Sequence, residues 1–494
     1  MPIVLINKQM QKTGSTSVDL VMERKWAKRL FILSALAGLF LFAGCYTAPK
    51  NQSSKLKVDT PNSWNSSETR VNFEPQNWVK DFNDPMLVAI IEEALAHNYN
   101  LKAAEARLAS QIAGSRFGAS VVWPSLNGSA SQNRNKRSSA TGINQTPTAE
   151  TFGLNLRFNW EIDIWGKVRN GYRGDLADIQ SAQADYAATR LSIAGRVAQF
   201  WYDAIEAKQQ YELAVRTQEA LESSALIVEE NFTRGIARAL DVRLVRANVA
   251  SNKSTLEARL RTKENSVRGL ETLLGRYPAN ELAVAGKIPD VSGPVPAGLP
   301  SELLLRRPDV ISVERTLAAN EQRKFETSKA RIPSINLTLS RGTTTRELED
   351  VFDIIDRRVW SQALNFSQVW FQGGRLRANF RRAKANYEQS LANYASTVLT
   401  AFREVEGALS NQSSYDRDYE SQKIAAEESA AAETLAWEEY GRGLTGITTA
   451  LDAVRRNITA QRSFIQVANQ RVQARIDLYL ALGGGFDLKP EAEN

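Results

Sequence analysis

The feature that most constrains the fold is a long strand that leads directly into a very long helix. Residues 152–164 alternate apolar and polar side chains, with Phe152 and Trp160 on the apolar side, which is the period of a β-strand. A helical pattern without proline then runs from about Gly166 to about Phe232. At roughly 1.5 Å per residue this helix would be on the order of 100 Å long. A membrane barrel standing on a helical tube would join such elements, whereas few soluble folds do.

The composition excludes most catalytic chemistries. The 494 residues include one histidine and one cysteine, and the formal charge is +7. A lone His97 and a lone Cys45 leave metal-dependent and histidine-assisted mechanisms without their usual groups, so we expect no enzymatic activity and no cofactor, and an ordinary surface or packing role for His97. No basic cluster is interleaved with aromatic residues, so no nucleic acid is expected as a partner.

The N-terminus has the organisation of a signal peptide. A basic segment precedes an apolar segment at residues 30–43, which is too short to span a bilayer comfortably. The Ala-Gly-Cys that follows resembles a bacterial lipoprotein signal, which implies cleavage and lipid attachment at Cys45; an ordinary signal peptide with a chance cysteine is the alternative. Residues 1–44 would then be an upstream extension and a signal, with Met22 the better start. The resemblance also implies the outer membrane as destination, because Tyr46 follows the cysteine in place of the aspartate associated with retention at the inner membrane.

The long helix carries a heptad seam. Apolar residues keep a four-three spacing from Ile193 to Phe232, broken only at Gln218. Such a seam requires a partner helix. After a turn at residues 234–241, a second helix over about 239–274 keeps the same spacing. The sequence therefore predicts an αα-hairpin with an exposed tip.

The second half of the chain repeats the first. The motif that begins at Pro124 recurs at Pro333, an offset of 333 − 124 = 209, and the Arg234-Gly235 turn recurs at Arg442, an offset of 442 − 234 = 208. Offsets that agree this closely indicate an internal duplication. Each half is predicted to contain a helix, a β-hairpin, a long helix and a returning helix.

The repeat gives the expected domain organisation. Pro85 and Pro308 should each open the first helix of their half, because proline is favoured at a first helical position; the first of these helices is expected over 86–117. The predicted segments are a signal region at 1–44, an arm at 45–84, a first repeat at 85–275 with a hairpin at 120–164, a belt at 276–307, a second repeat at 308–483 with a hairpin at 333–371, and a tail at 484–494.

Four strands per chain cannot close a membrane barrel, because open edges in lipid leave backbone groups unpaired. Three chains would supply about twelve strands through identical contacts. The expected fold class is therefore mainly α, with a trimeric twelve-stranded membrane β-barrel on a long coiled-coil tunnel. Five tryptophans near strand ends would form an interfacial girdle, although each could equally be a core aromatic. They are Trp123, Trp160, Trp165, Trp360 and Trp370.

Three further motifs carry a family resemblance. The GLPS at 298–301, the LLRRPD at 304–309 and the GGRL at 373–376, together with the repeat and the lipoprotein signal, resemble the TolC-type outer-membrane efflux proteins, and within them the lipoproteins of resistance–nodulation–division (RND) systems, the NodT family. The resemblance implies a homotrimeric duct through outer-membrane lipid that docks on a periplasmic adaptor and an inner-membrane RND pump. Such ducts pass drugs and other small molecules out of the cell and perform no chemistry.

The resemblance also implies a gate at the periplasmic tip of the second hairpin, where the family has acidic residues around the aperture. Leu451-Asp452-Ala453 matches that pattern, so Asp452 is the main candidate. Thr449 and Thr445 stand where relatives have a second Asp and an Arg, and Asp241 is taken as the analogue in the first repeat. Three Asp452 carboxylates around one axis would favour cations and raise each other's pKa. The alternative is a solvated charge near a helix start.

Two other functions remain open from the sequence. The exit duct of a type I protein-secretion system would share the duct architecture, and only the family resemblance favours small-molecule efflux over it. A coiled-coil lipoprotein that scaffolds the envelope without transport would explain the signal and the heptads. It would give no reason for four amphipathic strands.

Overall fold

The computed structural model describes residues 47–56, 58, 60–66, 78–136, 148–291, 298, 300–353 and 355–484. Cys45, the predicted signal region at 1–44 and residues 485–494 lie outside the described residues. Residues 1–48 and 49–494 form separate units. The second unit contains all the helices and strands given below.

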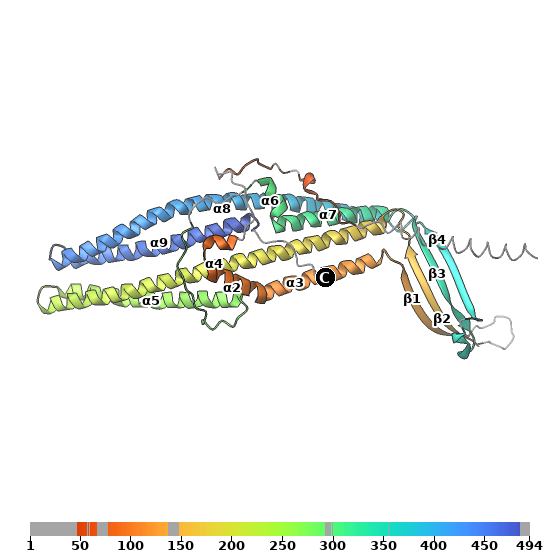
Figure 1. Cartoon of the computed structure of the whole chain (residues 1–494), viewed down its shortest axis with the longest axis horizontal. Helices are drawn as coiled ribbons and strands as arrows, with labels where there is room; N and C mark the ends of the chain where they lie inside the picture. The colour runs from red at the N-terminus through yellow and green to blue at the C-terminus, as the bar shows by residue number, and fades with distance from the viewer. Residues whose placement is uncertain are drawn as a thin grey trace, which may run out of the picture. The chain divides into compact units, whose positions relative to one another are not determined.

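Helices and one four-stranded sheet make up this unit (Figure 1). The first half contains η1 (Ser53–Lys55), η2 (Trp78–Phe82), α2 (Pro85–His97), α3 (Tyr99–Ser120), β1 (Ser125–Lys136), β2 (Thr148–Glu161), α4 (Lys167–Thr233) and α5 (Ala239–Leu273). The second half contains α6 (Pro300–Arg306), α7 (Pro308–Lys329), β3 (Ser334–Thr345), η3 (Glu349–Phe352), β4 (Arg358–Ser367), α8 (Arg375–Gly441) and α9 (Ile447–Ala481). The sheet lies at one end of the long helices and the two helix turns lie at the other (Figure 1).

The predicted internal repeat is confirmed by matched element lengths. Helices α3 and α7 both have 22 residues, and β1 and β3 both have 12. The long helices α4 and α8 both have 67 residues, and the returning helices α5 and α9 both have 35. The offset is 209 up to the first strand of each half (308 − 99) and 208 from the long helix onward (375 − 167).

The first helix differs from the prediction. Instead of one helix over 86–117, α2 and α3 are separated by Asn98, whose backbone is extended (φ −64°, ψ 123°). The Asn98 side-chain oxygen accepts hydrogen bonds from the amides of Asn100 (2.8 Å) and Leu101 (3.2 Å), as an N-cap does. Pro85 and Pro308 do open helices, α2 and α7. At the offset of 209, however, Pro308 corresponds to Tyr99 of α3 and not to Pro85.

The belt between the repeats crosses the helices and is anchored to them. Lys208 of α4 donates to the carbonyl of Val284 (2.9 Å). Arg471 of α9 is buried and bonds both to Asp290 of the belt (2.8 Å) and to Asp416 of α8 (2.5 Å). The prediction missed α6, which occupies the end of the belt and corresponds to the last turns of α2.

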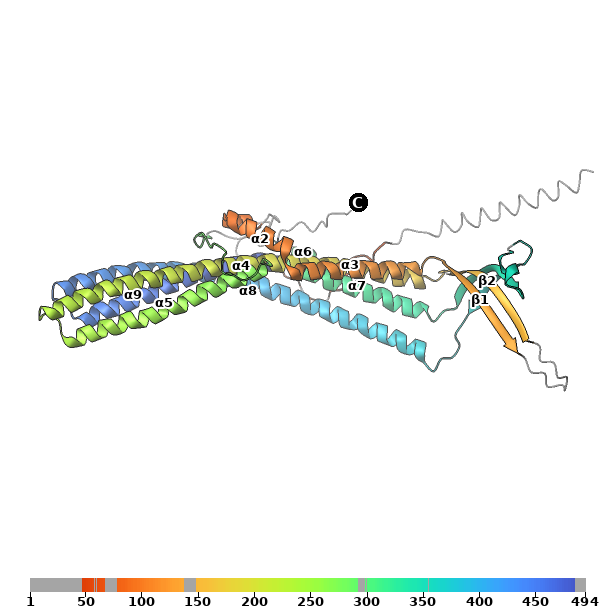
Figure 2. The same ribbon diagram turned by 90° about the horizontal axis from the view of Figure 1, so that it is seen from below.

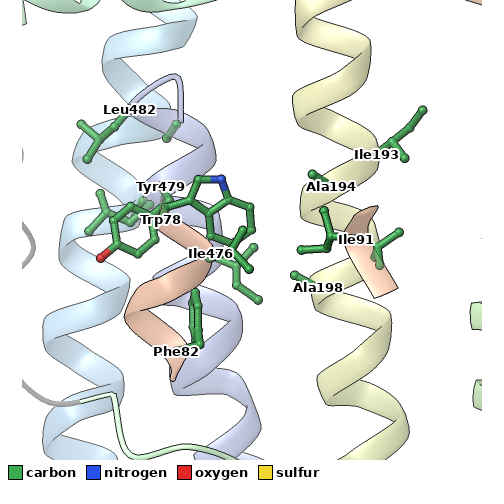
Figure 3. Packing of buried hydrophobic residues seen from close by; sticks show 14 of the residues in the cluster. Trp78, Phe82, Ile91, Ile193, Ala194, Ala198, Ile476, Tyr479 and Leu482 are labelled. Atoms are coloured by element: carbon green, nitrogen blue, oxygen red, sulfur yellow. The ribbon is translucent and has the colours of Figure 1, made fainter. Parts of the chain in front are cut away.

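The core lies midway along the helices, where the N-terminal arm packs against them. In η2, Trp78 stacks on Tyr479 of α9 with ring centroids 5.9 Å apart, and Phe82 packs against Tyr202 of α4 at 5.6 Å. Figure 3 shows Trp78 and Phe82 beside α9, and Ile91 of α2 beside α4. Burial of such large apolar side chains stabilises the fold by about 1.5–3 kcal/mol each.

The predicted seam joins α4 to α5. Val197, Ala204 and Val228 are fully buried. Gln218, which breaks the apolar pattern, is buried as well, and its side-chain oxygen accepts a hydrogen bond of 3.0 Å from Asn252 of α5. A buried polar pair in an apolar seam favours one alignment of the two helices, because any shift would separate the two amides.

The sheet has one apolar and one polar face. Its order is β1-β2-β3-β4, and all pairs are antiparallel. On one face Phe158 lies opposite Leu126 and Leu339, and on the other face Asn159 lies opposite Ser125 and Thr338. The outer strands β1 and β4 are the two edges of the sheet. Among the predicted girdle residues Trp160 is half-buried and the other four are exposed.

No α-helix in the described ranges has both the length and the apolar character needed to cross a membrane.

Replacing Asn98 by alanine should destabilise the junction of α2, α3 and α5. The change removes the cap of α3 and a hydrogen bond of 2.8 Å from the Asn98 amide to the carbonyl of Leu273, so we expect a loss of about 1–2 kcal/mol. Chemical unfolding of the purified protein followed by circular dichroism measures it. Asn100→Ala, at an exposed site two residues later, is the control and should cost far less.

Candidate functional site: the two helix turns

The two helix turns share one backbone geometry. Gly235 and Gly443 have φ of 77° and 75°, a left-handed conformation that strongly favours glycine after a helix. The Gly235 amide donates to the carbonyl of Phe232 and the Gly443 amide to that of Tyr440, both at 3.0 Å. The recurrence of glycine at both turns is therefore explained by backbone geometry.

The turns of the two hairpins pack against each other within one chain. Val228, Val242, Val245 and Ile447 form a buried apolar cluster that joins α4, α5 and α9. Tyr440 of α8 packs against this cluster. Burial raises the pKa of Tyr440, and the negative charge of Asp241 raises it further, while a hydrogen bond with Asn231 opposes the shift. Asp241 therefore lies where the first hairpin meets the second.

Asp241 is a structural cap of α5. Its side chain is only 8% exposed, and it pairs with the Arg238 guanidinium at 3.1 Å. It also accepts a hydrogen bond of 3.0 Å from the Arg238 backbone amide. Burial alone would raise the pKa of Asp241, but the hydrogen bonds from Arg238 outweigh burial and hold this pKa below its ordinary value. Its stabilising effect is therefore present above about pH 4 and is lost as the pH falls further.

The structure changes the predicted correspondence between the tips. Asp241 is the third residue of α5, and the third residue of α9 is Thr449. Asp452 is the sixth residue of α9, where α5 has Leu244. Asp241 is thus the counterpart of Thr449. The sequence analysis had instead matched it to Asp452. Thr449 is exposed, and Gly446, the N-cap of α9, provides no side-chain cap.

Asp452 is held by two arginines of its own helix. Its side chain, 36% exposed, pairs with Arg456 at 2.8 Å and with Arg455. Hydrogen bonds from Arg456 and then Arg455 lower the pKa of Asp452. The sequence analysis missed these partners, although arginines three and four residues after a helical aspartate are a known signal for such pairs.

A groove of about 430 Å³ lies beside Asp452, between α5 and α9. Asp452 and Arg455 line one wall, and Asn248 and Asn252 of α5 line the other. The tip therefore presents a carboxylate and guanidinium groups on an exposed helix next to an open groove. Such an arrangement can attract or repel ions and can contact a partner helix.

Comparison with known proteins agrees with this architecture. The family model described as "Outer membrane efflux protein" matches residues 90–276 and 299–484, once for each half. The chain belongs to the outer membrane efflux protein family. The predicted family, the predicted role as the outer-membrane component of an efflux system and the predicted location in the outer membrane are thereby confirmed.

Individual relatives cover nearly the whole chain. The pyoverdine export outer membrane protein OpmQ of Pseudomonas aeruginosa is 28% identical over 92% of this chain and 97% of its own length. The solvent efflux pump outer membrane protein SrpC of Pseudomonas putida is 29% identical over 82% of this chain and 87% of its own. The crystal structure of the CmeC outer membrane channel of Campylobacter jejuni superposes with a TM-score of 0.82 at 25% identity, over 90% of this chain and 96% of that one.

The start of α9 should open more readily than the start of α5. Only α5 has a carboxylate cap there, and such a cap contributes about 1 kcal/mol. Amide hydrogen exchange in residues 451–454 should therefore be about fivefold faster than in residues 243–246. Thr449→Asp, which restores the missing carboxylate, should slow exchange in α9.

Thr448→Asp is the matched control, because it adds the same charge one residue earlier. Equal protection by both variants would mean that charge near the helix start, and not the cap, sets the opening rate.

Proposed function

We propose that three copies of this chain form the exit duct of an RND-type tripartite efflux system. The single observation that supports this best is the four-stranded sheet, which has one apolar face, two edge strands and direct continuity with the long helices. In lipid such edges must be paired, and three copies would join twelve strands into one barrel with the apolar face outward. The helices would continue as a tunnel into the periplasm.

The cargo and the partners follow from the family. Relatives are described as exporting pyoverdine or solvents, which supports small organic molecules as the cargo. A periplasmic adaptor and an inner-membrane pump would complete the system, with the pump supplying the energy. The duct itself would act by diffusion through its lumen and not as an enzyme.

We further propose that lipid attached at Cys45 anchors the duct in the outer membrane. The support is the order of basic, apolar and small residues before this cysteine. One acyl chain alone binds a membrane weakly, so the anchor would act together with the inserted barrel.

The charge balance at the proposed gate differs from the one expected from the sequence. Each Asp452 is accompanied by Arg455 and Arg456, so three copies would bring more positive than negative charge to the aperture. The carboxylates would then neutralise part of this positive charge rather than create a cation-selective ring. Thr449 and Asp241 would contribute to the gate by the stability of their helix starts.

Single-channel conductance in a planar bilayer tests this role. Asp452→Ala leaves both arginines unpaired, so the ratio of cation to anion permeability should fall severalfold. Arg455→Ala/Arg456→Ala leaves the carboxylate alone and should shift the ratio in the opposite direction. Conductance without any change of selectivity in either variant would keep the duct but remove Asp452 from its gate.

Mass spectrometry of the mature N-terminus tests the anchor. The wild-type protein should begin at Cys45 and carry added acyl mass, and Cys45→Ala should lose the acyl mass. A mature wild-type N-terminus at another residue, with an unmodified cysteine, would instead indicate an ordinary signal peptide.

A further inference from the structure

We propose that Arg341, Arg358 and Trp360, on the apolar face of the sheet, bind the phosphorylated head group of a lipid in the outer leaflet. The site rests on the proposed barrel, in which this face is turned toward lipid. What points to it is the uneven distribution of charge between the two faces and the two ends of the sheet.

The apolar face of the sheet holds most of its charged residues. Successive residues of a strand alternate between the faces, so the register assigns every strand residue to the face of Phe158 or to the opposite one. Among the residues of β1 to β4, the polar face has only Arg157 and Glu161 as charged side chains. The charged residues of the apolar face are Arg134, Lys136, Glu150, Arg341 and Arg358. Charge on a face turned toward lipid is costly unless it has a partner.

These charges lie at the end of the sheet away from the long helices. The apolar face of β3 is aliphatic from Ile335 to Leu339 and only then reaches Arg341. In β4 the same face begins with Phe366, and Arg358 comes last, after Trp360. Because the helices would enter the periplasm, the charged end is the outer rim of the barrel. The arginines therefore lie at the level of the head groups of the outer leaflet.

Arg341 and Arg358 are diagonal neighbours on this face. Arg341 lies opposite Trp360, and Arg358 lies opposite Thr343, two residues further along β3. Diagonal neighbours are about 7–8 Å apart, which is within reach of long side chains. Two guanidinium groups at this spacing repel each other unless an anion lies between them. A phosphate can accept hydrogen bonds from both.

Neither arginine has an acidic partner among the residues that the structure describes. Both are exposed, whereas the neighbouring Arg357 pairs with Asp350 at 2.8 Å. Asp353 accepts hydrogen bonds from the amides of Ile355 and Asp356, at 3.3 and 3.1 Å. The other carboxylates of the turn are exposed and make the turn itself acidic: Glu347, Glu349 and Asp356. The anion site is therefore confined to the two strand arginines.

The turn provides an apolar wall beside the arginines. Its helix η3 packs against β2 and β3 at the end of the sheet away from the long helices (Figures 1 and 2). It lies on the apolar face, because Thr343 of that face donates a hydrogen bond of 2.6 Å to the carbonyl of Val351 and is only 2% exposed. Phe352 of η3 and Trp360 stay 73% and 70% exposed. Exposed aromatic side chains next to unpaired cations fit an amphiphile with acyl chains and an anionic head group.

Calorimetric titration of the purified full-length protein with short-chain lipids tests the site. The probes are dioctanoyl phosphatidic acid, whose head group is a phosphate monoester, and dioctanoyl phosphatidylcholine, which has the same acyl chains but no net charge. Arg341→Gln and Arg358→Gln should each weaken the binding of phosphatidic acid about tenfold, because each removes charged hydrogen bonds to the phosphate. Circular dichroism should be unchanged, since both side chains are exposed. Phosphatidylcholine should bind the wild type about tenfold more weakly than phosphatidic acid does.

Two controls define what is bound. Arg157→Gln removes one exposed arginine from the polar face of the same sheet, so it should change the affinity for phosphatidic acid less than about twofold. Inorganic phosphate in about tenfold molar excess should not displace the lipid, because it gains nothing from Trp360 and η3.

The outcomes separate this site from the duct itself. Weaker binding in both arginine variants and near-normal binding in Arg157→Gln supports the site. Equal losses in all three variants, or no loss in Arg341→Gln and Arg358→Gln, would overturn it. Displacement by inorganic phosphate would overturn the lipid as its ligand. These results leave the duct intact when the wild type is a trimer in lipid nanodiscs. A wild-type chain that remains monomeric there would overturn the duct, and with it the outward face on which the site depends.

Discussion

A strand edge that enters lipid must find a partner for every backbone amide and carbonyl, and this requirement governs the rest of the structure. The sheet has two edges, β1 and β4, because the four strands run in order without closing. The proposed barrel would therefore need further copies, and the helices that continue from the sheet would be brought into the same ring. The apolar stripe through Phe158 and the polar stripe through Asn159 make one side suited to lipid and the other to water.

The large apolar core lies midway along the helices. There the arm, α2, α4 and α9 bring together Trp78, Phe82, Tyr202 and Tyr479. A few buried polar groups fix the alignment of the helices around this core: Asn98 ties the start of α3 to the end of α5, and Gln218 with Asn252 sets α4 against α5. Toward the turns the packing thins to a small apolar cluster, so the ends of the hairpins depend more on their caps.

Much of the fold can be predicted from the sequence, because two of its patterns are strong. The heptads of α4 predicted the long helix within one residue at each end, and the period-two stretch at 152–164 predicted the strand within three to four residues. The helix break at Asn98 could not be predicted from the sequence, because the Asn98 side chain is held by a hydrogen bond to the carbonyl of Leu273, which is far away in sequence. The predicted counterpart of Asp241 was wrong, because Asp241 was matched by residue type rather than by position in the helix. The arginine partners of Asp452 could have been predicted from their spacing in the sequence, but the sequence analysis missed them.

The equal lengths of the matched helices have a mechanical consequence. Both long helices have 67 residues and both returning helices have 35. The two turns therefore lie the same number of residues after the start of their long helices. One extra residue in α8 alone would advance its turn by about 1.5 Å and rotate it by about 100°, which would carry the seam out of phase with α9. Seven extra residues, close to two full turns, would restore the phase but leave one rim of the tube longer than the other. Insertions are therefore tolerable only when both halves change together, which ties the length of each half to that of the other.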